Sequence, residues 1–436
     1  MRQLRSVFRH VSSVSIASAA ALLCAACAGS TPHPIAAAGS AQPPPAATPG
    51  AAATLKAVLF GYIPDSANDN FAALTAALTR QFETETPGVR ARITIDPNVD
   101  LFDLAPGGRL ETLLGEGPDA ADVLEVDSLT LGDLVKNGWV QPASVEPPGI
   151  LPVAWTAASV SGQHFGVPTY LCSNVVYSYD PGLAGVRDAR SLLSLLTSIS
   201  PATPLVGDYA GSWTLPSVYL DAWADTNDAA KLADAYVPPV DAATMSLWQP
   251  LVRSCAGSPP ANANPCLDGT FHDNTSAEAA FAAGRANGFI GYTERLFYIL
   301  TARPAQKPSV ISAPLGGGSH PVMFVDVLVV NRHCTGGCRN RANAFILYMT
   351  RVSTRTLIAF SQDAPPGAIP RYLLQANADF YRQAEARQDL FYPQFWSFIQ
   401  NATPFPNQGF PEDRKPLGQA VKAALDAAGA APPPNP

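Results

Sequence analysis

Residues 55–60 read Leu-Lys-Ala-Val-Leu-Phe, and residues 61–65 continue with Gly-Tyr-Ile-Pro-Asp. The first run is short and mostly apolar, which predicts a β-strand, and the Gly and Pro of the second run predict where the strand ends. Over residues 71–84 apolar side chains recur at helical spacing, which predicts a helix. A strand followed by a helix is the unit that the next segments repeat.

This strand–helix alternation continues to residue 135. The pattern predicts a second strand at 89–95, a short helix at 110–114, a third strand at 122–127 and a helix at 129–135. That order predicts a parallel sheet with right-handed crossovers. Because ligands bind beyond the carboxyl ends of the strands in such sheets, we expect Tyr62 and Asp127 on the ligand side.

The second half of the chain has the same character. An extended segment is predicted at 166–177 with Cys172 near its centre, a strand at 288–292 ahead of Glu294, and a strand at 322–330 that contains Asp326. Helices are predicted at 276–285, 342–350, 353–362, 391–401 and 416–427, and another after the Gly-Ser-Trp turn that carries Trp213. A pattern of this size resembles the type II periplasmic-binding-protein fold, in which two α/β lobes enclose a ligand cleft.

The domain organisation follows from this pattern and from the length of the chain. We predict a first α/β lobe from residues 55–165 plus about 315–365, and a second α/β lobe from residues 166–314 plus about 366–428. Residues 429–436 are expected to be a disordered tail.

The first 54 residues have the composition of an export signal and a tether. Three arginines in the first nine residues precede an apolar stretch at 11–23, which is too short to cross a bilayer and predicts a signal peptide. Residues 22–27 resemble a bacterial lipobox, so residues 1–27 are interpreted as a lipoprotein-type signal with lipid on Cys27. An ordinary signal peptide cut at an Ala-rich site is the alternative. Residues 28–54 are rich in Ala and Pro and predict an extended tether.

Composition excludes one class of partner. Charged residues make up 14% of the chain and the net charge is −7, which does not suit nucleic-acid binding. No segment after the leader is long and apolar enough to span a membrane. We therefore expect an exported protein, secreted or held on the bacterial cell envelope by a lipid anchor only.

Four of the seven cysteines form two local pairs, Cys255 with Cys266 and Cys334 with Cys338. In an oxidising compartment such pairs predict disulfides; zinc ligation is the alternative, although the second half of a zinc finger is missing. Cys172 then remains as a free thiol, which in an exported protein suggests wanted reactivity. Taken alone, a cysteine in an apolar strand is also compatible with an inert core position.

Two short segments are the most specific part of the sequence: residues 167–174, Val-Pro-Thr-Tyr-Leu-Cys-Ser-Asn, and residues 291–295, Gly-Tyr-Thr-Glu-Arg. The first is similar to the nucleophile segment of the thiaminase I family of secreted thiamine pyridinylases, and the second resembles that family's Gly-Tyr-Ser-Glu segment. The distance between the two blocks is also similar. Further agreement lies at residues 62–65, 125–127 and 324–327, so the resemblance covers most of the mature chain.

The resemblance implies Cys172 as the nucleophile and Glu294 as the base of a pyridinylase that transfers the pyrimidinylmethyl group of thiamine to another base or thiol through a covalent Cys adduct. It implies thiamine and a co-substrate of the pyridine, aniline or thiol type as partners, no metal or organic cofactor, and a monomer. Two positions depart from the family pattern, because Phe60 and Phe324 stand where tyrosines are expected.

Substrate binding is expected at Tyr62, Asp127, Tyr292 and Asp326, which lie in the matching blocks. Trp213, in the Gly-Ser-Trp turn outside those blocks, is a further candidate for the same aromatic wall. The two acids would bind the pyrimidine or offset the thiazolium charge, and the aromatic rings would stack on the ligand or face its cation. Each has a structural alternative: the tyrosines suit a core, Asp127 suits a helix cap, and Asp326 suits a buried hydrogen bond.

Other functions remain open from the residues alone. Glu294 is also compatible with a solvated helix-start acid beside Arg295. A lipid-anchored solute-binding protein that hands thiamine or a related pyrimidine to a transporter would use the same fold, but it needs neither Cys172 nor Glu294.

A cysteine hydrolase is the third class, and it requires a His to activate the thiol. His164, His272, His320 and His333 lie in no recognisable hydrolase signature.

Overall fold

The computed structural model describes residues 52–199, 202–256, 263–272 and 275–429. These residues belong to one compact unit, Ala52–Pro436. The predicted signal peptide, its lipidation site Cys27, and most of the tether lie outside the described residues. None of the described helices has the length and apolar character that crossing a membrane requires.

The larger of two main sheets has eight strands. Its path runs in the order β13 (Leu374–Gln375), β7 (Gly166–Cys172), β12 (Val322–Asn331), β3 (Val123–Asp127), β1 (Ala53–Leu59) and β2 (Val89–Ile95), while β4 (Val140–Gln141) and β14 (Thr403–Pro404) also pair with β12. Strand β1 runs parallel to β2 and β3, as predicted. Strand β12 is antiparallel to β3 and β7, so the whole sheet is mixed.

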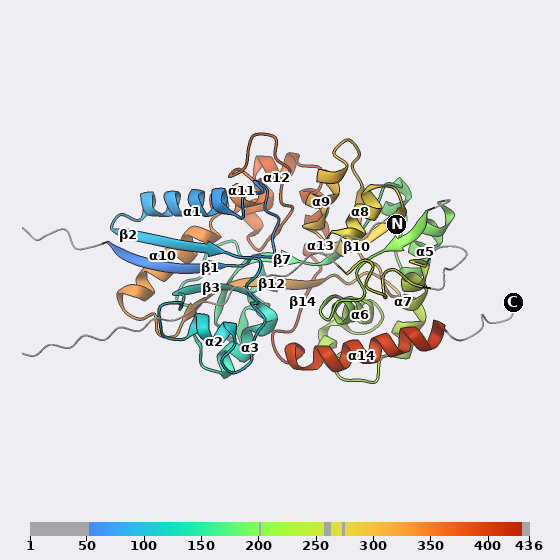
Figure 1. The fold of residues 1–436 in the computed structure, drawn as a ribbon, viewed down its shortest axis with the longest axis horizontal. Helices are drawn as coiled ribbons and strands as arrows, with labels where there is room; N and C mark the ends of the chain where they lie inside the picture. Colours follow the sequence, from blue (N-terminus) through green and yellow to red (C-terminus); the bar gives the residue numbers. More distant parts are fainter. Residues whose placement is uncertain (1–51, 200–201, 257–262, 273–274, 430–436) are drawn as a thin grey trace, which may run out of the picture. The chain divides into compact units, whose positions relative to one another are not determined.

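Helices cover both faces of the larger sheet. One face is packed against α1 (Ala72–Glu85), α10 (Gly337–Thr350) and α11 (Val352–Ala359), and the other against α2 (Arg109–Leu114), α3 (Leu131–Lys136) and α4 (Pro152–Ala157). Figure 1 shows α1 and the α2–α3 pair on opposite sides of the strands. All five residues of β3 are buried, as expected for a central strand covered on both faces.

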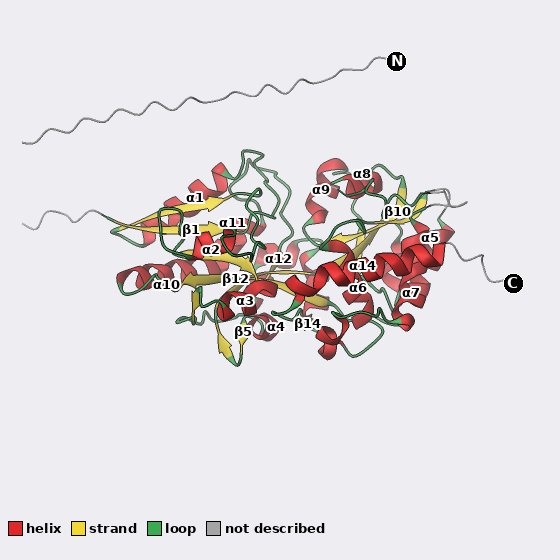
Figure 2. Cartoon of the chain, turned by 60° about the horizontal axis from the view of Figure 1, so that its bottom comes forward, coloured by secondary structure: helices red, strands yellow, loops and turns green. Residues whose placement is uncertain are grey.

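The smaller sheet has four strands, in the order β11 (Ser309–Ser312), β8 (Asn174–Ser178), β10 (Ala286–Tyr292) and β9 (Thr203–Val206). It is surrounded by α5 (Ala189–Ser198), α6 (Thr214–Ala224), α7 (Ala242–Ser254), α8 (Ser276–Ala282) and α9 (Arg295–Ala302). Figure 2 shows these helices on the right with β10, whereas β1 of the larger sheet lies on the left. The two sheets give the two-lobed α/β architecture that was predicted.

The remaining elements are short, except the last helix. They are the hairpin β5 (Ser159–Val160) and β6 (Gln163–His164), the 3-10 helices η1 (Ser128–Thr130), η2 (Pro181–Gly185), η3 (Ala229–Ala235) and η4 (Ala378–Arg382), and the helices α12 (Ala384–Gln388), α13 (Tyr392–Ile399) and α14 (Phe410–Gly429).

The chain passes from one sheet to the other at the predicted extended segment 166–177. This segment is two strands rather than one: β7 ends at Cys172 in the larger sheet, and β8 begins at Asn174 in the smaller sheet. The predicted second lobe began at residue 166, whereas the strand pairing places Gly166–Cys172 with the larger sheet. The other lobe boundaries stay a prediction. Cys172 therefore lies where the two sheets meet.

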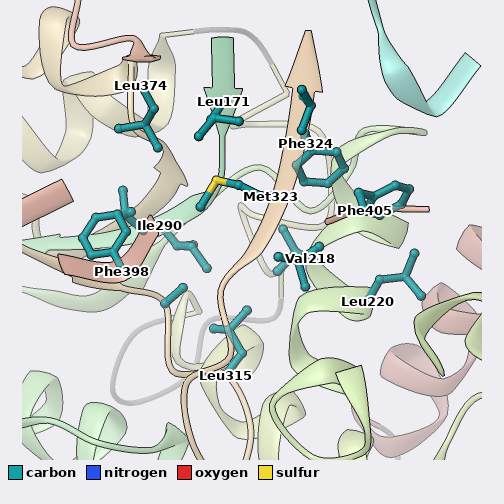
Figure 3. Packing of buried hydrophobic residues seen from close by; sticks show 14 of the residues in the cluster. Leu171, Val218, Leu220, Ile290, Leu315, Met323, Phe324, Leu374, Phe398 and Phe405 are labelled. Carbon is teal, nitrogen blue, oxygen red and sulfur yellow. The ribbon is translucent and has the colours of Figure 1, made fainter. Parts of the chain in front are cut away.

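A single apolar cluster spans both sheets. Figure 3 shows Leu171 of β7 and Met323 of β12 in the same group as Ile290 of β10, Val218 of α6 and Phe398 of α13. All five side chains are buried. The crossing point is therefore packed firmly, which restricts where the side chain of Cys172 can go.

Both predicted disulfides are confirmed. Cys255, directly after α7, is bonded to Cys266, and Cys334 is bonded to Cys338 at the start of α10. Asp122 lies close enough to the second pair to complete a three-ligand cluster, but both sulfurs there are used in the bond. The zinc alternative is therefore not the arrangement that the structure shows.

Candidate active site

Cys172 is the one free cysteine among the described residues. As the last residue of β7 it pairs with Phe324 of β12, so the sheet sets its position. Its partly buried side chain lines a cavity of about 600 Å³, which lies within the roughly 300–1,000 Å³ of small-molecule sites. The alternative of an inert core cysteine does not fit a sulfur that borders a cavity.

Glu294 faces this thiol. It follows β10 and occupies the position just before α9, where its side chain makes no capping hydrogen bond. Instead, the Sγ of Cys172 donates to Glu294 Oε2 over 3.7 Å. Glu294 is only 8% exposed, so the alternative of a solvated helix-start acid fails. The fold brings together two residues that are 122 positions apart.

Arg295 holds the other oxygen of this carboxylate. Its Nε lies 3.6 Å from Glu294 Oε1, and its Nη1 lies 3.3 Å from Oε1 of Glu278, a buried acid in α8. The guanidinium thus bridges two carboxylates and leaves Glu294 Oε2 directed at Cys172. The neighbouring arginine therefore belongs to the site and does not point into solvent.

Burial controls the protonation of the pair. It raises the pKa of the Cys172 thiol well above the ordinary range, and the charges of Glu294, Asp326 and Asp127 raise it further. Burial also raises the pKa of Glu294, while Arg295 opposes that shift. The raised pKa favours the protonated thiol, and the Glu294 carboxyl is the group that the thiol contacts.

Asp127 and Asp326 lie opposite each other on β3 and β12, and both line the cavity. The Oδ1 of Asp127 accepts the amide N–H of Leu129 at 3.0 Å, so Asp127 is also the helix cap that the alternative interpretation expected. Burial raises the pKa of Asp127 to about 7. Burial and the charge of Asp127 raise the pKa of Asp326 well above its usual range.

These shifts allow one carboxyl of the pair to donate a hydrogen bond while the other accepts one. At neutral pH the pair retains a proton, because two adjacent buried carboxyls do not both ionise readily. A neutral carboxylic acid donates a hydrogen bond, whereas a carboxylate only accepts. A ring with one acceptor nitrogen and one amino donor would match such a pair.

Glu125, two residues before Asp127, forms hydrogen bonds to two other segments near the site. Its Oε2 accepts the amide N–H of Phe60 at 3.1 Å, and its Oε1 accepts the hydroxyl of Thr169 at 2.6 Å. Phe60 follows β1 and Thr169 lies in β7. One buried carboxyl therefore links the strand end near Tyr62 to the strand that carries the cysteine.

Three predicted aromatic residues also border the cavity. Tyr62 is 42% exposed and donates its hydroxyl to Val99 O at 3.3 Å. The hydroxyl of Tyr292 lies 3.4 Å from Ser217 Oγ. The core alternative therefore fails for Tyr62, whereas Tyr292 is largely enclosed and still reaches the cavity.

Trp213 packs among aromatic rings that the sequence did not single out. Its ring centroid lies 4.6 Å from that of Phe102, and the guanidinium of Arg414 lies 3.7 Å above the ring. Phe102 and Phe410 complete the wall. Trp213 therefore lines the cavity, and its ring packs against Phe410 and Arg414 of α14.

The two departures from the expected tyrosines lie in the same cavity. Phe60 packs edge-on against Tyr62 with centroids 5.0 Å apart, and Phe324 stacks on Phe405 at 4.5 Å. Both are at least nine-tenths buried. The rings are kept as apolar walls without the hydroxyl groups.

The sequence interpretation missed Asp208 and gave His272 no role, yet both line the cavity and lie 3.3 Å apart. Asp208 follows β9 by two residues, so the rule that ligands gather at strand ends would have found it if β9 had been predicted. No sequence pattern singles out His272, because its loop has no regular period. The cavity thus contains a second pair of ionisable residues.

Comparisons with known proteins agree with the fold and with the expected family. No family model matches the chain. Thiaminase-1 of Paenibacillus thiaminolyticus is 27% identical over 346 residues, which cover 75% of this chain and 77% of that protein.

Solved structures give the same result. Thiaminase I from Bacillus thiaminolyticus (TM-score 0.63, 23% identity) and Clostridium botulinum thiaminase I in complex with thiamin (0.64, 20%) each match over 86% of this chain and 99% of theirs. The GacH receptor of Streptomyces glaucescens, a protein studied with acarbose, aligns with a TM-score of 0.63 and 16% identity over 86% of this chain and 97% of that protein. The similarity to thiaminase I and the periplasmic-binding-protein type of fold are both confirmed.

Proposed function

We propose that this chain is a thiamine pyridinylase of the thiaminase I kind. The observation that carries the proposal is the 3.7 Å contact between Cys172 Sγ and Glu294 Oε2 on the wall of a 600 Å³ cavity. The similarity to thiaminase I supports an enzyme of this kind. A receptor of the same fold has no use for a buried base aimed at a free thiol.

The first half of the reaction removes the thiazole. Glu294 takes the proton of Cys172, and the thiolate adds to the electron-poor pyrimidine carbon beside the ring nitrogen. The electrons of the ring then expel the thiazole, which leaves as a neutral molecule. The product of this half is a covalent Cys adduct that carries an exocyclic methylene group.

The second half releases the enzyme. A nucleophile adds to the methylene carbon, the ring regains its aromatic electrons and the C–S bond breaks. The departing thiolate of Cys172 takes back the proton that Glu294 has kept. Cysteine suits this chemistry because its thiolate is both a strong nucleophile and a fair leaving group.

Charge supports a cationic substrate. Five acids line the cavity, Asp100, Asp127, Asp208, Glu294 and Asp326, against one arginine and one histidine. The Asp127–Asp326 pair would bind the aminopyrimidine, and the rings of Tyr62, Trp213 and Tyr292 would enclose the flat ligand. The thiazolium charge then lies in a cavity whose acids outnumber its cations and whose walls are partly aromatic.

The test is release of thiazole from thiamine in the presence of pyridine, followed by chromatography. Cys172→Ser is expected to abolish turnover but to keep thiamine binding in calorimetry. Glu294→Gln is expected to lower kcat by about 10²–10⁴-fold, the usual contribution of a general base. Tight binding of thiamine by the wild type without any thiazole release would instead establish the solute-binding function.

A cysteine hydrolase is disfavoured by the same geometry. The partner of the thiol is a carboxylate, whereas such hydrolases use a histidine. We further propose that the reaction needs no metal or organic cofactor and that the protein acts as a monomer.

Export and the lipid anchor rest on the leader sequence. The predicted lipid anchor is tested by expressing the protein in a bacterial host and analysing its mature N-terminus by mass spectrometry. A lipid-modified Cys27 would support the anchor. An unmodified end produced by cleavage at another Ala would show an ordinary signal peptide.

A further inference from the structure

The cavity wall holds a second ionisable pair that the mechanism above does not use. Nδ1 of His272 lies 3.3 Å from Oδ2 and 3.4 Å from Oδ1 of Asp208. Both residues border the same cavity as Cys172 and Glu294. The pair comes from two separate segments, one after β9 and one before α8.

The carboxylate of this pair is held firmly. Oδ1 of Asp208 accepts the amide N–H groups of Ala210 at 3.0 Å and Gly211 at 3.2 Å. A methyl group placed on Gly211 would lie 3.3 Å from Cε1 of His272, so the imidazole packs against the turn that leads to Trp213. The carboxylate and the turn together orient the ring.

The free nitrogen of the imidazole is available for chemistry. With Nδ1 engaged by Asp208, the neutral ring carries its acceptor at Nε2, and Nε2 makes no hydrogen bond to any described residue. The side chain of His272 is 55% exposed, so a proton taken up there can pass to solvent. Glu294, at 8% exposed, is far more enclosed.

The proposed reaction has to remove a second proton when the co-substrate carries a hydrogen on its attacking atom. During the covalent adduct, Glu294 already carries the proton of Cys172 and must return it to the departing thiolate. An aniline that attacks the methylene carbon becomes a positively charged ammonium group and has to lose its own proton. Until the thiolate has taken the first proton back, Glu294 is neutral and cannot accept the second.

We propose that the Asp208–His272 pair is the general base for co-substrates that carry a proton, an inference that rests on the proposed pyridinylase function. The nitrogen lone pair of an aniline forms the new C–N bond, the C–S bond breaks, and Cys172 recovers the proton of Glu294. Nε2 of His272 takes the N–H proton and releases it to water. Thiol co-substrates lose their S–H proton by the same route.

Pyridine provides the internal reference, because its nitrogen has no hydrogen to lose. We expect His272→Gln to lower the ratio of kcat/KM for aniline to kcat/KM for pyridine by about 10²-fold, the lower end of general-base effects. Asp208→Asn should lower the same ratio by a smaller factor. Added imidazole should restore the aniline reaction of His272→Ala but should leave its pyridine reaction at the same rate.

A matched control is His164→Gln. Nδ1 of His164 also contacts a carboxylate, Glu146 Oε1 at 3.0 Å, but His164 does not line the cavity. Its aniline-to-pyridine ratio should equal that of the wild type.

Three outcomes would overturn the inference: an unchanged ratio in His272→Gln, an equal fall with both co-substrates, or an equal fall of the ratio in the His164 control. Failure of the pyridinylase function would look different, because the wild type would then release no thiazole with pyridine.

Discussion

Asp127 and Asp326 form a close acidic pair whose protonation couples to folding. Burial raises the pKa of Asp127 to about 7 in the folded protein, and burial together with the charge of Asp127 raises the pKa of Asp326 well above its usual range. Aspartates in an unfolded chain titrate near pH 4. Folding therefore takes up protons between about pH 4 and pH 7, so this pair makes stability fall as the pH rises through that window.

Asp127→Asn should remove much of this pH dependence. Asn is as good a helix cap as Asp, so the acceptor for the amide of Leu129 is kept. A carboxyl with a pKa near 7 in the folded state and near 4 in the unfolded state changes the free energy of unfolding by about 4 kcal/mol across that window. As the pH rises from 4 to 7, the variant should therefore become more stable than the wild type by up to that amount. Urea unfolding at several pH values measures the gain.

Asp127→Ser provides the check on this interpretation, because it also caps the helix but has no carboxyl group. The slope of its free energy of unfolding against pH should change by the same amount as in Asp127→Asn. Parallel stability curves for the wild type and both variants would show that Asp127 does not carry the proposed proton in the folded state.

At the scale of elements, the turn that leads into α14 packs closely against Gly132 of α3. The amide of Gly132 in α3 donates to Asn407 O at 2.8 Å, and Nδ2 of Asn407 donates to the carbonyls of Ala157 and Ser159. This turn places Phe410, the first residue of α14, at the cavity. The predicted helix start at residue 416 was six positions late, because Pro416 lies inside the helix instead of opening it.

Gly132→Ala should destabilise the protein. Alanine favours a helix by about 1 kcal/mol over glycine, but the new methyl group would lie 2.6 Å from Gln408 Cβ and 2.8 Å from Asn407 O. Overlap of this kind costs about 1–3 kcal/mol, so a net loss of about 1 kcal/mol is expected in chemical unfolding.

Gly337→Ala is the control for this substitution. It is also a helical glycine, but its added methyl group would meet only the flexible end of Arg341, at 3.4 Å. It should be neutral or slightly stabilising. Equal effects of the two substitutions would mean that the contact between α3 and the turn at residue 407 is not tight.

At the scale of the whole compact unit, the two sheets share one apolar cluster. Because each sheet would lose part of its core if the other unfolded, we expect one cooperative transition in calorimetry. Thiamine added to the inactive Cys172→Ser variant should shift that transition upward, since a ligand at 100 times its Kd adds about 2.7 kcal/mol. Two transitions, of which thiamine shifts only one, would show lobes that unfold independently.

Local pattern was sufficient for a large part of the fold. Apolar periodicity predicted β1, α1, β2 and β3, because these elements bury one face or both faces against neighbours within their own lobe. The two disulfides followed from short spacing along the chain. The motifs around Cys172 and Glu294 led to thiaminase I, to which the chain is indeed similar.

The remaining features were decided by contacts between segments that are distant in the sequence. The break at Ser173 between β7 and β8 was not visible, because an extended chain has the same pattern in one sheet as in two. The neighbours of the site, Arg295 bridging two acids and His272 beside Asp208, were likewise unpredicted. A sequence records which residues are apolar or ionisable, whereas distance and burial, which set pKa values and reactivity, exist only once the chain has folded.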